Sequence, residues 1–108
     1  MQDILTLIAD GVLTLTINRV DKKNSFTPAM YAAMAEGLEL AKTDPAIRVT
    51  VIQGDVTVFS AGNDIGDFLQ RKPSTQESPV CQFLRAIASH PKPVIAAVCG
   101  PAVGIGTT

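Results

Sequence analysis

The sequence of 108 residues lacks a charge excess, a cysteine framework and a long apolar segment. Nine Lys and Arg residues face ten Asp and Glu residues, and the basic ones are scattered, so there is no electrostatic basis for nucleic-acid binding. Cys81 and Cys99 have neither metal-site spacing nor the number of a disulfide framework, which favours a reduced, intracellular setting. Without a membrane-spanning run or a secretory signal, we expect a cytoplasmic location and no membrane partner.

Several motifs for nucleotide binding and hydrolysis are also missing. Gly100, Gly104 and Gly106 follow the spacing G-x-x-x-G-x-G, which is not the dinucleotide fingerprint, and neither a P-loop nor a G-x-S-x-G elbow is present. No set of residues has metal-ligand spacing, so no metal is expected. His90 is the only histidine, and its place between a helix and Pro91 favours a structural role over a catalytic one.

The first part of the chain predicts two strands and a helix. Residues 3–9 and 12–18 are expected to form antiparallel strands around Asp10-Gly11, which is a hairpin signal. After a polar loop, a helix is expected to begin at Thr27-Pro28, because threonine caps helices well and proline fits the first helical position. Thr43-Asp44-Pro45 is expected to end it.

The second part predicts two more strands and further helices. Residues 48–54 suit a strand covered on both faces. A short helix near 63–69, a polar loop over 70–79 and a helix near 77–89 follow, and residues 94–98 predict a buried strand. The order β-β-α-β-(α)-α-β indicates a mixed α/β fold with helices packed on a sheet.

Two stretches of small residues follow two of these strands. The first turn is Phe59-Ser60-Ala61-Gly62-Asn63-Asp64-Ile65, and the second turn is Gly100-Pro101-Ala102-Val103-Gly104-Ile105-Gly106. Small side chains let the backbone approach a ligand, and glycine adopts angles that other residues resist. Either turn alone is equally consistent with a tight turn that binds nothing. Together, each supplying one N–H group, they can hold a single developing negative oxygen.

The two turns, with Lys92-Pro93-Val94-Ile95-Ala96-Ala97-Val98 between them, resemble the enoyl-CoA hydratase/isomerase (crotonase) superfamily. Asn18-Arg19 and Asn24, followed by a helix, fit the same pattern. The resemblance covers essentially all 108 residues and matches the N-terminal half of the family's catalytic domain. It implies a crotonase-like spiral of β-β-α units, of which residues 1–108 are the N-terminal portion, and we expect the sequence to be truncated.

The resemblance also implies a site. The family binds acyl-CoA thioesters, and two backbone N–H groups grip the thioester oxygen and stabilise an enolate-like intermediate. Carried over by position, the first donor is the N–H of Asn63, and the second is the N–H of Ile105, with Gly104 as the alternative. The residues implied to line the substrate pocket are Ala61, Gly62, Asn63, Asp64, Ile65 and Gly104.

Two of these implications have ordinary alternatives. Lys22 and Lys23 lie in the loop that approaches the CoA phosphates in relatives, but for either lysine alone a solvated loop residue is the favoured interpretation. Asp64 can cap the short helix expected near 63–69 instead of contacting a ligand.

The sequence departs from the family pattern at its end. Hydratases usually carry a glutamate where Thr108 aligns, and a threonine hydroxyl is too weak an acid to serve as a general base. Asn63, and Gly-Pro-Ala-Val-Gly-Ile in place of a glycine triplet, look like the Δ3,Δ2-enoyl-CoA isomerase branch. Isomerases of that branch use one carboxylate placed later in the chain, and no such base is found in residues 1–108.

The resemblance therefore leaves three alternatives open. The chain belongs to an isomerase, to an enoyl-CoA hydratase, or acts by itself as a non-catalytic acyl-CoA-binding fragment. No cofactor is implied, because CoA is part of the substrate. Full-length relatives are typically trimers or dimers of trimers, so a homotrimer or hexamer is expected.

Overall fold

A computed structural model of the chain describes residues 3–62 and 79–106, and four strands form one sheet in the order β1-β2-β3-β4. The hairpin pair is antiparallel, while β2 with β3 and β3 with β4 are parallel. The predicted element order is confirmed for this part of the chain. The strands are β1 (Ile4–Ala9), β2 (Val12–Ile17), β3 (Val49–Gln53) and β4 (Val94–Ala97).

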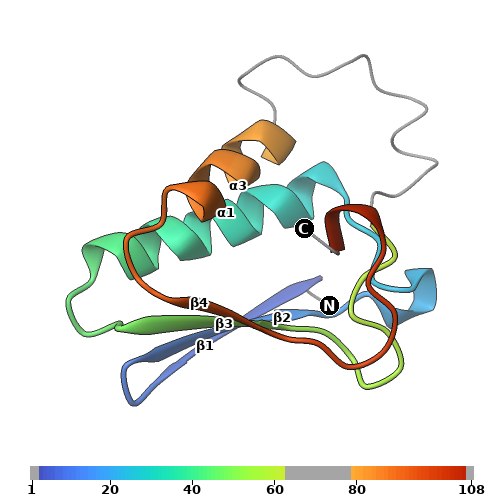
Figure 1. Cartoon of the computed structure of the whole chain (residues 1–108), viewed down its shortest axis with the longest axis horizontal. Coiled ribbons are helices and arrows are strands. Elements are labelled where there is room, and N and C mark those ends of the chain that lie inside the picture. Colours follow the sequence, from blue (N-terminus) through green and yellow to red (C-terminus); the bar gives the residue numbers. More distant parts are fainter. Residues whose placement is uncertain (1–2, 63–78, 107–108) are drawn as a thin grey trace.

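Two α-helices, α1 (Pro28–Thr43) and α3 (Pro79–Ala88), pack against each other on one face of the sheet (Figure 1). Two short 3-10 helices, η1 (Val20–Lys22) and η2 (Gly104–Gly106), lie in the connections. The short helix expected near 63–69, and all but the end of the polar loop expected over 70–79, lie outside the described residues.

Local sequence signals account for the hairpin and for the start of α1. Asp10 and Gly11 both have positive φ, 54° and 79°, as the tight hairpin turn requires. Thr27 caps α1 as predicted: its hydroxyl oxygen accepts the Met30 N–H at 3.3 Å, while its own N–H donates to the Met30 sulfur at 3.5 Å. Pro28 follows at the first helical position.

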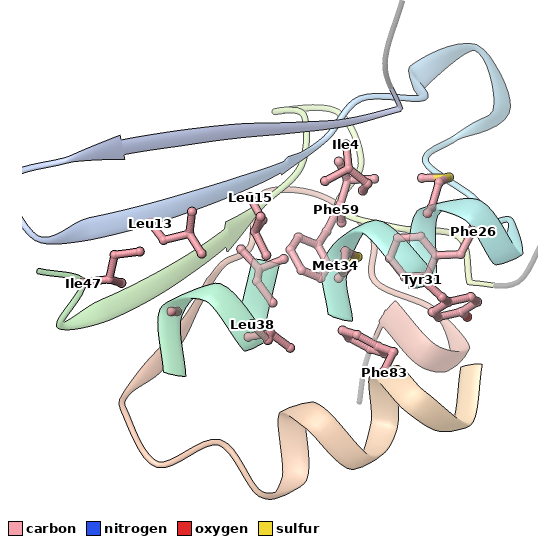
Figure 2. Close-up of a cluster of buried hydrophobic side chains, with 14 residues drawn as sticks. Ile4, Leu13, Leu15, Phe26, Tyr31, Met34, Leu38, Ile47, Phe59 and Phe83 are labelled. Atoms are coloured by element: carbon pink, nitrogen blue, oxygen red, sulfur yellow. The ribbon is translucent and has the colours of Figure 1, made fainter. Parts of the chain in front are cut away.

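The core lies between α1 and the sheet, as Figure 2 shows. Gly37 allows the close approach, because a Cβ placed there would lie 2.8 Å from a methyl carbon of Leu15. Tyr31 joins the two helices, with its ring 5.1 Å from that of Phe26 and 5.6 Å from that of Phe83. Burial raises the pKa of Tyr31 to about 12, so its hydroxyl stays protonated at neutral pH.

Two predictions about strand burial are wrong for the described residues. In β3, Thr50 and Ile52 are buried, but Val49 and Val51 on the other face are only half-buried, because both helices lie on one face. In β4, Ile95 is 53% exposed, and Val98 just after it is 50% exposed. Among the described residues β4 pairs only with β3, so one of its edges and its outer face stay open. The apolar composition therefore predicted where these strands lie but not which of their faces are buried.

Lys92 ties the end of α1 to the start of β4. Its ammonium group donates to the carbonyl oxygens of Ala41, Asp44 and Ile47 at 2.5, 2.9 and 2.7 Å. The last carbonyls of a helix lack intrahelical partners and form the negative end of its dipole. One half-buried cation therefore satisfies three acceptors and sets where β4 begins.

We predict that Lys92→Met lowers the free energy of unfolding by about 2–3 kcal/mol, because hydrogen bonds from a charged group are stronger than neutral ones. Lys42→Met is the matched control, since Lys42 is exposed in the last turn of the same helix and should change stability by no more than about 0.5 kcal/mol. Urea unfolding followed by circular dichroism measures both. Equal effects of the two substitutions would contradict this role for Lys92.

Candidate functional site

The first and second turns lie side by side beyond the ends of β3 and β4 (Figure 1). The Pro101 carbonyl accepts the N–H groups of Phe59 at 2.9 Å and Ser60 at 3.3 Å, and the Val103 N–H donates to the Ser60 carbonyl at 2.9 Å. A parallel bridge between Ser60 and Ala102 accompanies these bonds. The parallel pairing of β3 with β4 is thus resumed in the turns, and segments far apart in sequence meet there.

Glycine is required where the two backbones meet. Gly62 has a φ of +90°, and a Cβ on it would lie 2.9 Å from the Val103 carbonyl oxygen. A Cβ on Gly106 would lie 2.7 Å from the Ser60 carbonyl oxygen. Gly104 also has a positive φ, +58°, but among the described residues a Cβ there would meet only the Gly62 Cα, at 3.9 Å. Close approach at Gly62 and Gly106 therefore excludes side chains, whereas no described residue crowds Gly104 in this way.

A buried asparagine connects the loop before α1 to the first turn. Asn24 is fully buried, and its side-chain oxygen accepts the Arg19 N–H at 2.7 Å. Its amide nitrogen donates to the carbonyls of Val58 at 3.2 Å and Phe59 at 3.3 Å. The side chain thus hydrogen-bonds to the backbone of both the loop and the first turn, and it fixes the distance between them.

Ser60 continues this network within the turn. Its hydroxyl donates to the Asn24 carbonyl at 2.9 Å and accepts the Gly62 N–H at 3.0 Å. Two backbone bonds run alongside, from the Ala61 N–H to the Lys23 carbonyl at 3.0 Å and from the Phe26 N–H to the Gly62 carbonyl at 2.7 Å. The described half of the first turn is therefore held by hydrogen bonds at every residue from Ser60 to Gly62.

The structure brings together two of the predicted site residues, one from each turn. Gly62 in the first turn lies beside Gly104 in the second, and Ala61 and Ile105 are their neighbours in the chain. Ile105 is half-buried, and its N–H makes no hydrogen bond to any residue in 3–62 or 79–106. The other predicted members of the first turn, Asn63, Asp64 and Ile65, lie outside the described residues.

Lys22, the remaining predicted site residue, lies in the loop before α1. It ends η1 with an exposed side chain, and Lys23 follows with a left-handed backbone, φ 55°. Of these two lysines, Lys23 bonds the described part of the first turn, where its carbonyl accepts the Ala61 N–H. The described contacts thus tie the backbone of this loop to the turn and leave the Lys22 ammonium facing solvent.

A cavity of about 450 Å³ lies between α3 and β4 and reaches the second turn. Its walls are mostly apolar and include Phe26, Phe59, Phe83 and Ile105. His90 lines the same cavity, and its Nε2 atom is buried without a hydrogen-bond partner among the described residues. An apolar ligand group suits these walls better than a charged one.

The described part of the chain contains no cluster of three or more His, Cys, Asp or Glu side chains that could hold a metal ion. Within the same ranges, no helix has the length and hydropathy needed to span a membrane.

Asn24 and Ser60 are the site residues that sequence reasoning missed as functional candidates. Asn24 was noted only as part of a family pattern, and its one local signal is that asparagine tolerates the left-handed backbone it adopts here, φ 55°. Ser60 lies in the middle of the first turn, where a small residue is unremarkable. Their roles depend on contacts between positions more than 30 residues apart.

Comparison with known proteins gives consistent matches. The family model described as Enoyl-CoA hydratase/isomerase matches residues 8–108. The 1,2-epoxyphenylacetyl-CoA isomerase of Escherichia coli (strain K12) is 38% identical over 100% of this chain and 44% of its own. The peroxisomal enoyl-CoA delta isomerase 3 of Mus musculus is 34% identical over 99% of this chain and 35% of its own.

A solved structure agrees with these matches. Pseudomonas aeruginosa OdaA superposes with a TM-score of 0.95 at 52% identity, over 99% of this chain and 43% of that chain. The chain thus spans less than half the length of each of these relatives.

We predict that His90 makes stability depend on pH. Burial lowers the pKa of His90 below its ordinary value of 6.5, the cations of Lys92 and Lys42 lower it further, and Glu39 opposes them. Since the folded state binds this proton less tightly than the unfolded chain, stability should fall as pH drops through 6.5 and level off below the folded pKa. The stability difference between wild type and His90→Gln should therefore shift in that direction between about pH 8 and pH 5. Urea unfolding across this range checks it, and a constant difference would contradict it.

Proposed function

Because this chain belongs to the enoyl-CoA hydratase/isomerase family, we propose that the gene product binds an acyl-CoA thioester and stabilises its enolate between the two turns. The predicted α/β, crotonase-like fold is confirmed by the superposition on a family structure. In the proposal, the N–H of Asn63 and the N–H of Ile105, or of Gly104, donate to the thioester oxygen. The observation that carries the proposal is the contact of Gly62 with the Val103 carbonyl, which puts backbone from both turns at one point.

Two features of the described residues support such a site. The Ile105 N–H has no partner within 3–62 and 79–106, so it is free to donate to a ligand there. The neighbouring backbone is held by internal hydrogen bonds, so a donor would need little reorganisation as charge develops on the oxygen. Loss of one such donor typically costs about 2.7–4 kcal/mol of transition-state stabilisation.

The reaction that we propose is the shift of a double bond from the 3 to the 2 position of an enoyl-CoA. A carboxylate removes a proton from the α carbon, and the electron pair moves onto the thioester oxygen to give a dienolate. The same carboxyl group then returns the proton to the γ carbon. This step restores the carboxylate, and no other reagent is consumed. The relative named as an enoyl-CoA delta isomerase supports this choice. The carboxylate is proposed to come from outside residues 1–108.

Two alternatives to the isomerase reaction each have a specific observation behind them. The family description includes hydratases, which add water to a 2-enoyl-CoA. The absence of a suitable base in residues 1–108 favours a non-catalytic acyl-CoA-binding role for these residues by themselves. In either case the exposed Lys22 is proposed to meet the CoA phosphates, and Ala61 to Ile65 to line the CoA pocket.

The setting and the assembly are proposals of the same kind. We propose a cytoplasmic location, as expected from the sequence, although one relative is named as peroxisomal. A homotrimer or hexamer of the gene product is proposed from the family resemblance. Light scattering tests it, and a monomeric mass would contradict it.

The direct test supplies the purified gene product with a 3-enoyl-CoA and, separately, with a 2-enoyl-CoA. The proposal predicts a conjugated 2-enoyl-CoA from the first substrate, followed by its ultraviolet absorbance and by mass spectrometry. Water addition to the second substrate without isomerisation of the first identifies a hydratase. Calorimetric binding of an acyl-CoA without turnover supports the binding role, and no binding at all rejects the proposal.

Gly62 and Gly104 offer a matched pair of substitutions in the gene product. Gly62→Ala should lower kcat/KM by about 100-fold, because its Cβ would push the Val103 carbonyl away and displace the two turns by a fraction of an ångström or more. Gly104→Ala also strains a positive φ, but its Cβ meets no described atom closer than 3.9 Å and its N–H is kept, so its effect should be at least tenfold smaller. Steady-state kinetics with the better substrate measures both, and equal losses would contradict the close-contact account.

A further inference from the structure

We infer that Asn24 and Ser60 are positioning residues for the reaction: their buried hydrogen bonds hold the first turn in the orientation in which it donates to the thioester oxygen. This inference rests on the proposed function, because it assigns these residues to the same site. Neither side chain is proposed to touch the substrate. Their effect passes through the backbone of Ala61 and Gly62.

The position of the first turn is set from the loop before α1. Asn24 is 0% exposed, so water does not replace its bonds to Arg19, Val58 and Phe59. The bonds to Val58 and Phe59 hold the backbone just before the turn. A shift of Asn24 would therefore move the entry of the turn relative to the loop.

The shape of the turn is set by Ser60, which is also 0% exposed. Its hydroxyl uses its single proton on the Asn24 carbonyl and one lone pair on the Gly62 N–H. These two bonds join the loop, the start of the turn and its glycine through one atom. Without that oxygen, the Gly62 N–H would be left buried without this partner, and the turn would relax to find another.

The orientation of the turn follows from the carbonyl of Gly62. It accepts the Phe26 N–H at 2.7 Å, the shortest of the bonds between the loop and this turn. A carbonyl held in this way fixes the orientation of Gly62 relative to the loop before α1.

The simpler reading is that these bonds only stabilise the fold. The two readings differ in what a mild substitution does. A purely structural bond would lower stability and leave the chemistry of the folded fraction unchanged. Loss of a positioning bond would weaken the hydrogen bonds to the thioester oxygen even in fully folded protein.

The test measures the strength of the hydrogen bonds to the thioester oxygen. It uses the gene product and butyryl-CoA that carries a ¹³C label at the thioester carbonyl. Butyryl-CoA has no double bond to move, so its carbonyl can be observed at rest. Difference infrared spectroscopy reports the carbonyl stretch, which moves to lower frequency when the oxygen accepts strong hydrogen bonds. Wild type should show a clear shift on binding, Ser60→Ala should lose most of it, and Asn24→Ala should behave like Ser60→Ala.

Two control variants separate positioning from stability. Thr50→Val removes another buried hydroxyl, on β3, whose oxygen has no partner among the described residues. Ile47→Val reduces the core near the opposite end of β3 and lowers stability by about as much as a lost hydrogen bond. Both should keep the full carbonyl shift. Ser60→Cys fills the space of the side chain but hydrogen-bonds weakly, so it covers the case in which Ser60→Ala fails to fold.

Kinetics provide the second readout. In Ser60→Ala, kcat should fall about 10- to 100-fold, because a small displacement of a donor weakens transition-state stabilisation. KM should change by less than about threefold, because the CoA contacts remain. Thermal melting and circular dichroism confirm that the variants are folded at the assay temperature.

The outcomes distinguish the inference from the proposed function. If wild type binds butyryl-CoA with an unshifted carbonyl, the proposed function fails and the inference fails with it. If wild type shows the shift and folded Ser60→Ala or Ser60→Cys keeps it, with kcat unchanged, the inference alone is overturned. A lost shift in the Ser60 variants together with an intact shift in Ile47→Val supports it.

Discussion

The close backbone contact between the first and second turns is the constraint on which the rest of the structure depends. Hydrogen bonds between Ser60 and its partners Pro101 and Val103 hold two distant segments at one point. At that distance no Cβ fits on Gly62 or Gly106, so the site consists of backbone. Backbone amides that are already fixed are suited to stabilise charge that appears on an oxygen during a reaction, because they need not move when it appears.

The scaffold brings the two turns to this contact by simple means. Because β3 and β4 are parallel neighbours, the segments that follow them leave the sheet at the same edge. The crossover between them includes α3, which packs on α1 through Tyr31 and Phe83, so its helix covers the same face as α1 (Figure 2). At the other end, Lys92 fixes the start of β4 to the end of α1. The Asn24–Ser60 network then links the first turn to the loop that enters α1.

Much of this arrangement could be predicted from the sequence, because its signals are local. Period-two apolar residues, the Asp10-Gly11 turn and the Thr27 cap specify their elements without reference to the rest of the chain. The cover of β3 and β4 could not be predicted, because it depends on which faces the helices occupy. The roles of Lys92 and Asn24 could not be predicted either. Both look like ordinary loop residues in the sequence, because the carbonyls that they bond come from distant segments. The small residues suggested that the two turns act together, but only the family resemblance assigned donors to them, since the spacing alone also fits two turns that bind nothing.

The central claim is that one thioester oxygen sits between the two turns. The most direct test is a crystal structure of the gene product with a bound, unreactive acyl-CoA such as butyryl-CoA. The account predicts the thioester oxygen within about 3 Å of one backbone nitrogen from each turn, that of Asn63 in the first and that of Ile105 or Gly104 in the second. A bound acyl-CoA whose carbonyl contacts neither turn, or only one of them, would contradict it.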